Sequence, residues 1–100
     1  MLERTVEKYL VRRVKEWGGI AYKFTSPGTR GVADRIVCLP GGRVFFVELK
    51  RPGGKLRPEQ ALFRKRMQFL KVACYTIDTK AQVDTLHVGT YQGWKDWVGL

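Results

Sequence analysis

Apolar residues recur at intervals of three and four along the first segment of the chain. The positions that follow this spacing are Leu2, Val6, Leu10, Val14 and Trp17. This period is that of one face of a helix, so the pattern predicts an amphipathic helix over residues 3–17. Gly18 and Gly19 follow directly and end the predicted helix.

Three short runs rich in β-branched and aromatic residues come next, and each predicts a strand. They cover residues 20–24, 35–39 and 43–49. The turn residues Pro40, Gly41 and Gly42 separate the second run from the third and predict a hairpin. The segment 25–33 is rich in glycine, proline and polar residues, which indicates an exposed loop.

Helical spacing returns after a basic loop. Pro58 suits the first position of a helix, and residues 58–71 continue with Phe63, Met67 and Leu70 as the apolar stripe. Gln60 falls on that stripe, so its amide needs a hydrogen-bond partner. The partner is either the backbone, or a water or phosphate at a site.

A last strand and a last helix complete the predicted order. Residues 72–77 form the strand, and Asp78 and Thr79 can cap a helix over about 80–88. The tail holds Tyr91, Trp94 and Trp97, which we expect to cover the core or a subunit contact. The order is helix, three strands, helix, strand, helix, an α/β arrangement.

Size and composition place this chain among small globular proteins. One hundred residues predict a single domain over 1–100, and 44% of them are hydrophobic. No apolar run approaches the roughly 20 residues that cross a bilayer, and the charged N-terminus does not resemble a signal peptide. Cys38 and Cys74 lie in apolar stretches, so we expect reduced core residues and a cytoplasmic protein that does not bind membranes.

The balance of charged residues is more informative than the overall composition. Nineteen lysines and arginines face nine acids, for a formal net charge of +10. Such a surplus in a small domain is typical of nucleic-acid binders. The same surplus would also suit a solvated cationic face, a ribosome-associated or membrane-surface protein, or a protein that docks on an acidic partner. The excess is greatest between Lys50 and Lys71, where Glu59 is the single acid.

Three polar residues at the ends of the hairpin strands carry the candidate chemistry. Asp34 precedes the first strand, and Glu48 and Lys50 project to the same side at the end of the second. Neighbouring strands would bring Asp34 within reach of Glu48. Two carboxylates suit a hard cation such as Mg²⁺, and with a lysine beside them they favour metal-assisted phosphodiester hydrolysis. This pattern by itself also occurs by chance at strand ends.

The first helix contributes two further acids near its buried face. Glu7 lies at the margin of the apolar stripe, and Glu3 lies closer to the centre of that stripe. Either acid is an ordinary boundary residue or a third ligand.

Several motifs occur in the order found in one nuclease family. The segments Lys23–Gly28, Gly31–Val37 and Phe46–Leu56, together with Gln60, resemble the virus-type replication–repair nuclease (VRR-NUC) domain of the PD-(D/E)XK superfamily. The resemblance runs from about Glu3 to Asp78. The family usually has proline before the first catalytic aspartate, where this chain has Ala33, and we expect a small effect on rigidity.

The resemblance implies a fold, a cofactor and roles for named residues. It implies a restriction-endonuclease-like core, a mixed central sheet flanked by helices. Asp34, Glu48, the Leu49 carbonyl and Glu7 would coordinate Mg²⁺ or Mn²⁺. The spacing of Glu7 before Gly18 is similar to that in archaeal Holliday-junction resolvases, so we prefer Glu7 as the acid of the first helix and keep Glu3 as the alternative. Lys50 would orient or activate the attacking water, and Gln60 would position water or phosphate. Residues that would hold DNA are Lys23, Ser26, Arg30, Arg51, Lys55, Arg57, Arg64 and Lys65.

The resemblance also implies a substrate class. Small standalone members of the family resemble Holliday-junction resolvases, so we expect a homodimer that cuts branched DNA in replication, recombination or repair. Three alternatives stay open. They are a nuclease that acts on flaps or nicks, an inactive nucleic-acid-binding module on the same fold, and a sequence-specific restriction enzyme.

Overall fold

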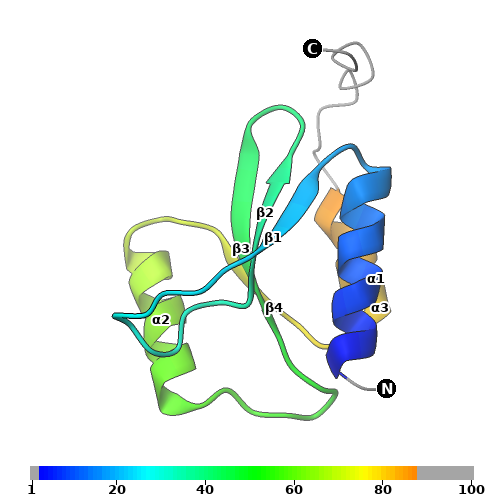
Figure 1. The fold of residues 1–100 in the computed structure, drawn as a ribbon. Coiled ribbons are helices and arrows are strands. Elements are labelled where there is room, and N and C mark those ends of the chain that lie inside the picture. The colour runs from blue at the N-terminus through cyan, green and yellow to red at the C-terminus, as the bar shows by residue number, and fades with distance from the viewer. Residues whose placement is uncertain (1–2, 88–100) are drawn as a thin grey trace.

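A four-stranded sheet lies between helices on its two faces in the computed structural model, which describes residues 3–87 (Figure 1). Helix α1 (Glu3–Glu16) and the short helix α3 (Lys80–Asp84) cover one face, and α2 (Pro58–Phe69) lies on the other. A 3₁₀ turn, η1 (Thr85–His87), follows α3. The predicted α/β class and the order of its elements are confirmed.

The sheet is mixed, as the resemblance implied. Its strands lie in the order β1 (Ile20–Lys23), β2 (Arg35–Leu39), β3 (Arg43–Leu49) and β4 (Cys74–Ile77). The first three strands pair antiparallel, and β4 pairs parallel to β3. The predicted hairpin of β2 and β3 is confirmed. Gly41 and Gly42 turn it with φ of 85° and 79°, a conformation in which a side chain would be strained.

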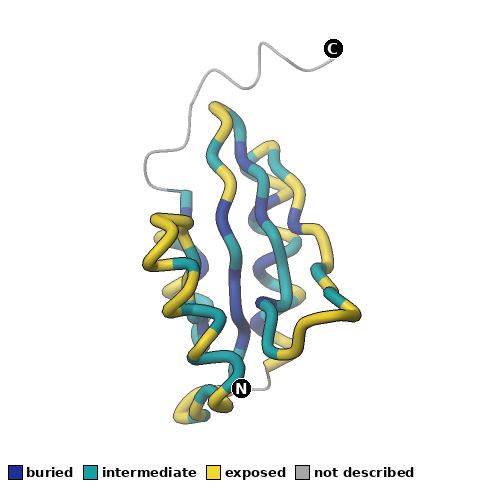
Figure 2. The backbone as a smooth tube through the Cα atoms, turned by 90° about the vertical axis from the view of Figure 1, so that its left-hand side faces the viewer, coloured by how far each residue is buried: buried dark blue, intermediate teal, exposed yellow. Residues whose placement is uncertain are grey.

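The core lies between the sheet and the helices α1 and α3. Val6, Leu10 and Val14 on α1 are fully buried, as their helical spacing predicted. Alternate residues of the strands meet them from the sheet, namely Val37, Leu39, Phe45, Val47, Leu49 and Ile77. Figure 2 shows the buried positions concentrated along the central strands.

The opposite face of the sheet is only partly covered. Helix α2 has no buried residue, although the Phe63 ring packs edge-on against Phe46 with centroids 5.5 Å apart. The predicted placement of Leu70 on a buried stripe is wrong, because α2 ends at Phe69 and the Leu70 side chain is exposed. Part of this sheet face stays open, where the side chains of Ile20, Tyr22 and Val44 are exposed.

Several element boundaries differ from the predicted ones by a few residues. The first helix ends one residue early at Glu16, and the last strand begins at Cys74 instead of residue 72. The last predicted helix, over 80–88, is shorter, because α3 gives way to η1 after Asp84. Both cysteines are free, as predicted, but half-buried rather than fully buried.

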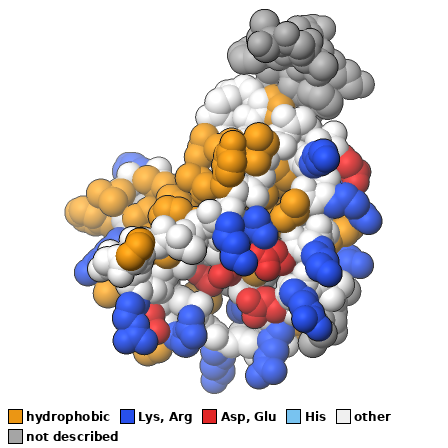
Figure 3. Space-filling model, in the orientation of Figure 1, with side chains coloured by type: hydrophobic (Ala, Val, Ile, Leu, Met, Phe, Trp, Pro, Cys, Tyr) orange, Lys and Arg blue, Asp and Glu red, His pale blue; other side chains and the backbone are white. Residues whose placement is uncertain are grey.

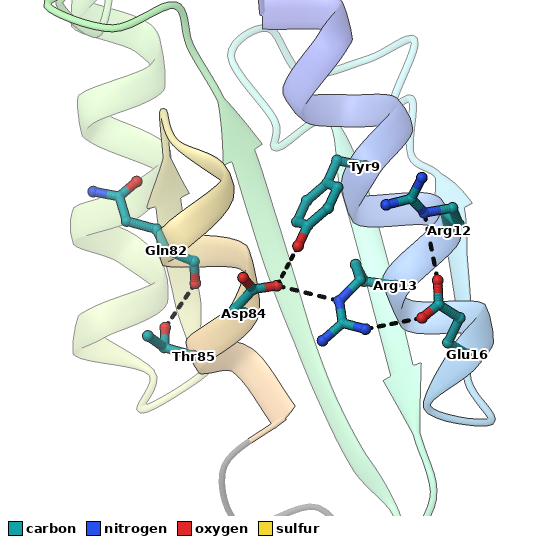
Figure 4. A network of polar contacts seen from close by, with 7 residues as sticks. All are labelled: Tyr9, Arg12, Arg13, Glu16, Gln82, Asp84 and Thr85. Carbon is teal, nitrogen blue, oxygen red and sulfur yellow. Dashed lines mark hydrogen bonds and ion pairs between the residues drawn. The ribbon is translucent and has the colours of Figure 1, made fainter.

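A polar network fastens α3 to α1 (Figure 4). The Tyr9 hydroxyl donates to Asp84 Oδ1 over 2.7 Å, and Arg13 Nε donates to the same oxygen over 3.2 Å. Arg13 also pairs with Glu16 at 2.8 Å. The hydrogen bond from Tyr9, with help from Arg13, lowers the pKa of Asp84. The network holds α3 where it closes the core.

The aromatic tail with Tyr91, Trp94 and Trp97 lies outside the described residues. In residues 3–87, every helix is too short or too polar to cross a membrane.

Candidate active site

The antiparallel pairing of β2 and β3 places Asp34 next to the end of β3. The Asp34 carbonyl accepts a hydrogen bond from the Phe24 amide at 2.9 Å, so its backbone extends the ladder between β1 and β2. Its Oδ2 accepts a hydrogen bond from the Leu49 amide at 2.7 Å. These two bonds fix both the backbone and the carboxylate of Asp34 against β3.

Glu48 is the buried acid of the site, with 5% of its surface exposed. Gln60 Nε2 donates to Glu48 Oε1 over 3.0 Å, and Gln60 Oε1 accepts from the Arg57 amide over 2.8 Å. Burial, and then the negative charge of Asp34, raise the pKa of Glu48 to about 8. The metal-free site therefore tends to retain a proton near neutral pH.

Lys50 is held at the same edge of the sheet. Its Nζ donates to the Gly54 carbonyl over 2.6 Å and lies 3.7 Å from Asp78 Oδ2. Because β3 and β4 run parallel, Lys50 and Asp78 each follow a strand that ends at this edge. The backbone bond from Lys50 N to Ile77 O, at 3.1 Å, continues this pairing.

The contact of Asp78 with Lys50 was missed from the sequence, where Asp78 was grouped with Thr79 as a helix cap. Thr79 is the N-cap of α3 and accepts a hydrogen bond from the Gln82 amide. The sequence shows an acid directly after the last strand. The contact of this acid with Lys50 could not be inferred without knowing that the strand pairs parallel to β3.

The candidate site residues lie around one cavity of about 310 Å³. It is formed by Glu3, Asp34, Glu48, Leu49, Lys50, Arg51, Gly54, Lys55, Arg57 and Gln60. Figure 3 shows acidic side chains near the middle of this view, with Lys and Arg side chains around them. The structure thus brings together five predicted site residues, Asp34, Glu48, Leu49, Lys50 and Gln60.

The acid of α1 at this cavity is Glu3 and not the preferred Glu7. Glu7 Oε2 pairs with Arg35 Nε at 2.9 Å, and Glu7 lines a separate groove on the outer side of α1. The physical reason is the strand alternation after Asp34, which turns Arg35 toward α1 and gives Glu7 a cationic partner. The structure therefore places Glu3 at the cavity, and the assignment of Glu7 as a ligand stays a prediction.

The predicted DNA contacts separate into two groups. Arg51, Lys55 and Arg57 line the cavity. The others lie outside it, with Lys23, Arg30 and Lys65 exposed and Ser26 half-buried. Arg64 turns toward β4, where it donates to Thr76 Oγ1 over 2.8 Å.

The loop before Asp34 is fixed against α2 by a close backbone approach. Gly31 has φ of 82°, and a Cβ there would lie 2.5 Å from the backbone of Glu59. Ala33, which directly precedes Asp34, is fully buried. The contact at Gly31 and the burial of Ala33 therefore fix the end of the loop that leads into Asp34.

Comparison with known proteins identifies the family. The chain is 47% identical over 78 residues to "Putative nuclease p44" of Acyrthosiphon pisum secondary endosymbiont phage 1, which spans 78% of this chain and 84% of that protein. A solved structure titled "VRR_NUC domain" matches it with a TM-score of 0.80 at 31% identity, over 89% of this chain and 97% of that chain. The chain belongs to the VRR-NUC family.

No family model matches the sequence, so this membership rests on the relative and the solved structure. The VRR-NUC match also confirms the predicted restriction-endonuclease-like fold. The VRR-NUC domain is a nuclease-type domain, and the cavity of this chain is lined by Asp34, Glu48, Lys50 and Gln60 from the motifs that carry the resemblance.

Proposed function

We propose that this VRR-NUC nuclease is a metal-dependent endonuclease that hydrolyses phosphodiester bonds in branched DNA as a homodimer. One observation carries the catalytic part of the proposal. Asp34 directly precedes β2, whereas Glu48 and Lys50 lie at the end of β3, and all three line a single cavity whose rim is cationic.

The residues of the cavity fit a divalent cation. Two carboxylates lie side by side, and Glu48 is almost wholly buried with a raised pKa, so a bound cation would relieve their repulsion. Residues 3–87 contain no group of three or more His, Cys, Asp or Glu side chains arranged to hold a metal. Asp34, Glu48 and the Leu49 carbonyl would therefore supply the protein ligands, which suits Mg²⁺ because it usually keeps several waters.

A bound Mg²⁺ or Mn²⁺ supplies charge neutralisation at the scissile phosphate and a lower pKa for water. The chain's own residues do the positioning. Lys50 uses one hydrogen bond on Gly54 and faces Asp78, which leaves donors for a phosphate oxygen or the attacking water. Its positive charge then stabilises the negative charge that develops on the phosphate.

Gln60 has a positioning role in this proposal. Its amide contacts Glu48 and the Arg57 backbone at once, so it holds the carboxylate in one orientation. Arg51, Lys55 and Arg57 at the rim would bind phosphates on either side of the scissile bond. Binding should therefore weaken steeply as salt rises.

Exposed apolar residues on the uncovered part of the sheet face favour a homodimer. Ile20, Tyr22 and Val44 expose 53%, 55% and 50% of their surfaces on the face that α2 leaves uncovered. The strand register aligns Ile20 and Val44 on either side of Cys38, so they form a row across three strands. Such a row suits a two-fold contact with a second copy, which would give the two sites that paired cuts in a junction need.

The deciding experiment is cleavage of an end-labelled four-way junction beside a duplex of matched sequence, with Mg²⁺ or EDTA. We expect paired symmetric cuts in the junction alone, absent in EDTA. Cutting of a flap or nick instead would support the alternative substrate. Retained binding without any cutting would support an inactive binding module, and discrete fragments from long duplex would support a restriction enzyme.

A further inference from the structure

The outer face of α1 carries a row of positive charge that the catalytic cavity does not use. Arg4, Lys8, Arg12 and Lys15 line a groove of about 510 Å³ on this face, together with Arg35 from β2. We call these four helix residues the α1 basic face. Figure 3 shows Lys and Arg side chains along the side of the molecule where α1 lies.

The acids near the α1 basic face are already paired. Glu7 is bound by Arg35 at 2.9 Å, and Glu16 is bound by Arg13 at 2.8 Å and Arg12 at 3.4 Å. Within residues 3–87, Arg4, Lys8 and Lys15 make no ion pair. Their charge is therefore free to act on a ligand.

The spacing of these cations opposes helix stability. Lys8 lies four residues after Arg4 and four before Arg12, so like charges stand one turn apart along the helix. Like charges at this spacing destabilise a helix. The packing of α1 does not require them, because its buried residues Val6, Leu10 and Val14 face the sheet.

The α1 basic face begins at the catalytic cavity. Glu3, which lines that cavity, is followed directly by Arg4, which lines the α1 groove. Between Arg4 and Lys15 the helix rises by roughly 16 Å, the length of about five steps along a DNA strand. DNA that enters the cavity can therefore continue along α1.

A membrane surface fits this face poorly. A helix that lies on a bilayer inserts its apolar side, and the apolar side of α1 is in the protein core. We propose that the α1 basic face is a second DNA-binding surface, which holds the phosphate backbone of a duplex arm that leaves the catalytic cavity. This inference rests on the proposed nuclease function and extends it.

The test compares two double variants that remove equal charge. K8Q/K15Q changes exposed residues of the α1 basic face. The control R66Q/K71Q changes exposed residues near the end of α2, which line neither the cavity nor the α1 groove. Glutamine keeps good helix propensity at positions 8, 15 and 66, and Lys71 lies after the end of α2 with an exposed side chain, so circular dichroism should show folded protein in each case.

Binding of a four-way junction with arms of about 15 base pairs is measured by fluorescence anisotropy in EDTA across a salt series. The arms are chosen to exceed the roughly 16 Å of the α1 basic face. For K8Q/K15Q we expect the slope of log affinity against log salt to shrink by about 2, with affinity roughly 10- to 100-fold lower near 0.1 M salt. R66Q/K71Q should change affinity by less than about threefold, and K8R/K15R should bind like the wild type. Cleavage at saturating DNA should be unchanged in K8Q/K15Q.

Equal binding by K8Q/K15Q and R66Q/K71Q, in a wild-type protein that binds and cuts DNA, would overturn this inference alone. A wild-type protein that binds no DNA would overturn both the inference and the proposed function. Loss of cleavage at saturating DNA in K8Q/K15Q would also contradict the inference, because it would place these lysines in the catalytic step.

Discussion

Gln60 donates a hydrogen bond from Nε2 to Glu48 Oε1 over 3.0 Å, and this contact joins the first turn of α2 to the end of β3. The same amide accepts from the Arg57 backbone, so the helix start, the basic loop and the buried acid are linked. The glutamine thus connects the DNA-binding rim with the proposed metal ligand.

Replacement of Gln60 by alanine should weaken metal binding. Without its donor, the Glu48 carboxylate loses its orientation and its ionised form loses a hydrogen bond. We expect the Mg²⁺ concentration for half-maximal cleavage to rise about tenfold. The matched control is Gln68→Ala on the exposed side of the same helix, and an equal effect of both changes would contradict the positioning role.

Lys50→Ala should abolish cleavage and spare binding. The change removes the positive charge beside the two carboxylates, while Arg51, Lys55 and Arg57 at the rim remain. We expect single-turnover cleavage to fall by at least about a hundredfold. Anisotropy in EDTA should show DNA affinity within about threefold of the wild type, since one phosphate contact at most is lost. Equal loss of cleavage and of DNA binding in a folded variant would refute a role of Lys50 in the cleavage step.

The metal-free protein should lose stability as pH rises from about 4.5 toward about 8. Burial and the charge of Asp34 raise the pKa of Glu48 to about 8, so the folded state binds the proton more tightly than the unfolded chain does. Stability is full below the unfolded value and declines until Glu48 ionises in the folded state. The measurement is Tm at pH 6 and pH 8, with EDTA and with Mg²⁺.

Mg²⁺ should raise Tm more at pH 8 than at pH 6, because the cation competes with the proton for Glu48. Glu48→Gln removes the titrating carboxyl, so it should flatten the decline of Tm in EDTA and abolish the shift with Mg²⁺. A decline that persists unchanged in this variant would assign the pH dependence to other groups.

Glu3 and Glu7 should differ in what their loss affects. Glu3 lines the cavity, so Glu3→Gln should slow cleavage by about tenfold with little change in stability. Glu7 pairs with Arg35, so Glu7→Gln should lower the free energy of unfolding by about 1 kcal/mol and leave the cleavage step intact. Cleavage rates at saturating DNA report the defect expected for Glu3→Gln. Urea denaturation reports the loss of stability expected for Glu7→Gln. A catalytic defect in Glu7→Gln alone would restore Glu7 as the site acid.

Val44→Glu should prevent dimer formation. The change places a charge in the apolar row of the open sheet face, which the proposed two-fold contact would bury. Light scattering after size exclusion should report a monomer, and paired cuts in the junction should become single cuts. Leu62→Glu, at an exposed position on α2, is the control and should stay dimeric. A dimer in Val44→Glu would exclude this face as the interface.

Much of the fold follows from local pattern. The stripe of Val6, Leu10 and Val14 defined α1, because a helix must bury one face. The strands β2 and β3 matched their predicted bounds, because a glycine turn between two β-branched runs leaves little choice of pairing. The prediction that Leu70 belongs to the apolar stripe was wrong. Its burial depended on where α2 ends and on which part of the sheet the helix covers, and neither follows from local pattern.

The motifs in the sequence were enough to indicate the family and to group the candidate site residues Asp34, Glu48 and Lys50. Asp34, Glu48 and Lys50 belong to neighbouring strands or their ends, where spacing and side-chain alternation already bring the groups together. Which acid of α1 lines the cavity could be learned from the three-dimensional packing alone, because Glu3 and Glu7 lie near the same edge of the helix and Arg35 pairs with Glu7. The parallel pairing of β4 with β3 likewise set Asp78 beside Lys50, since strand direction depends on contacts between segments far apart in the chain.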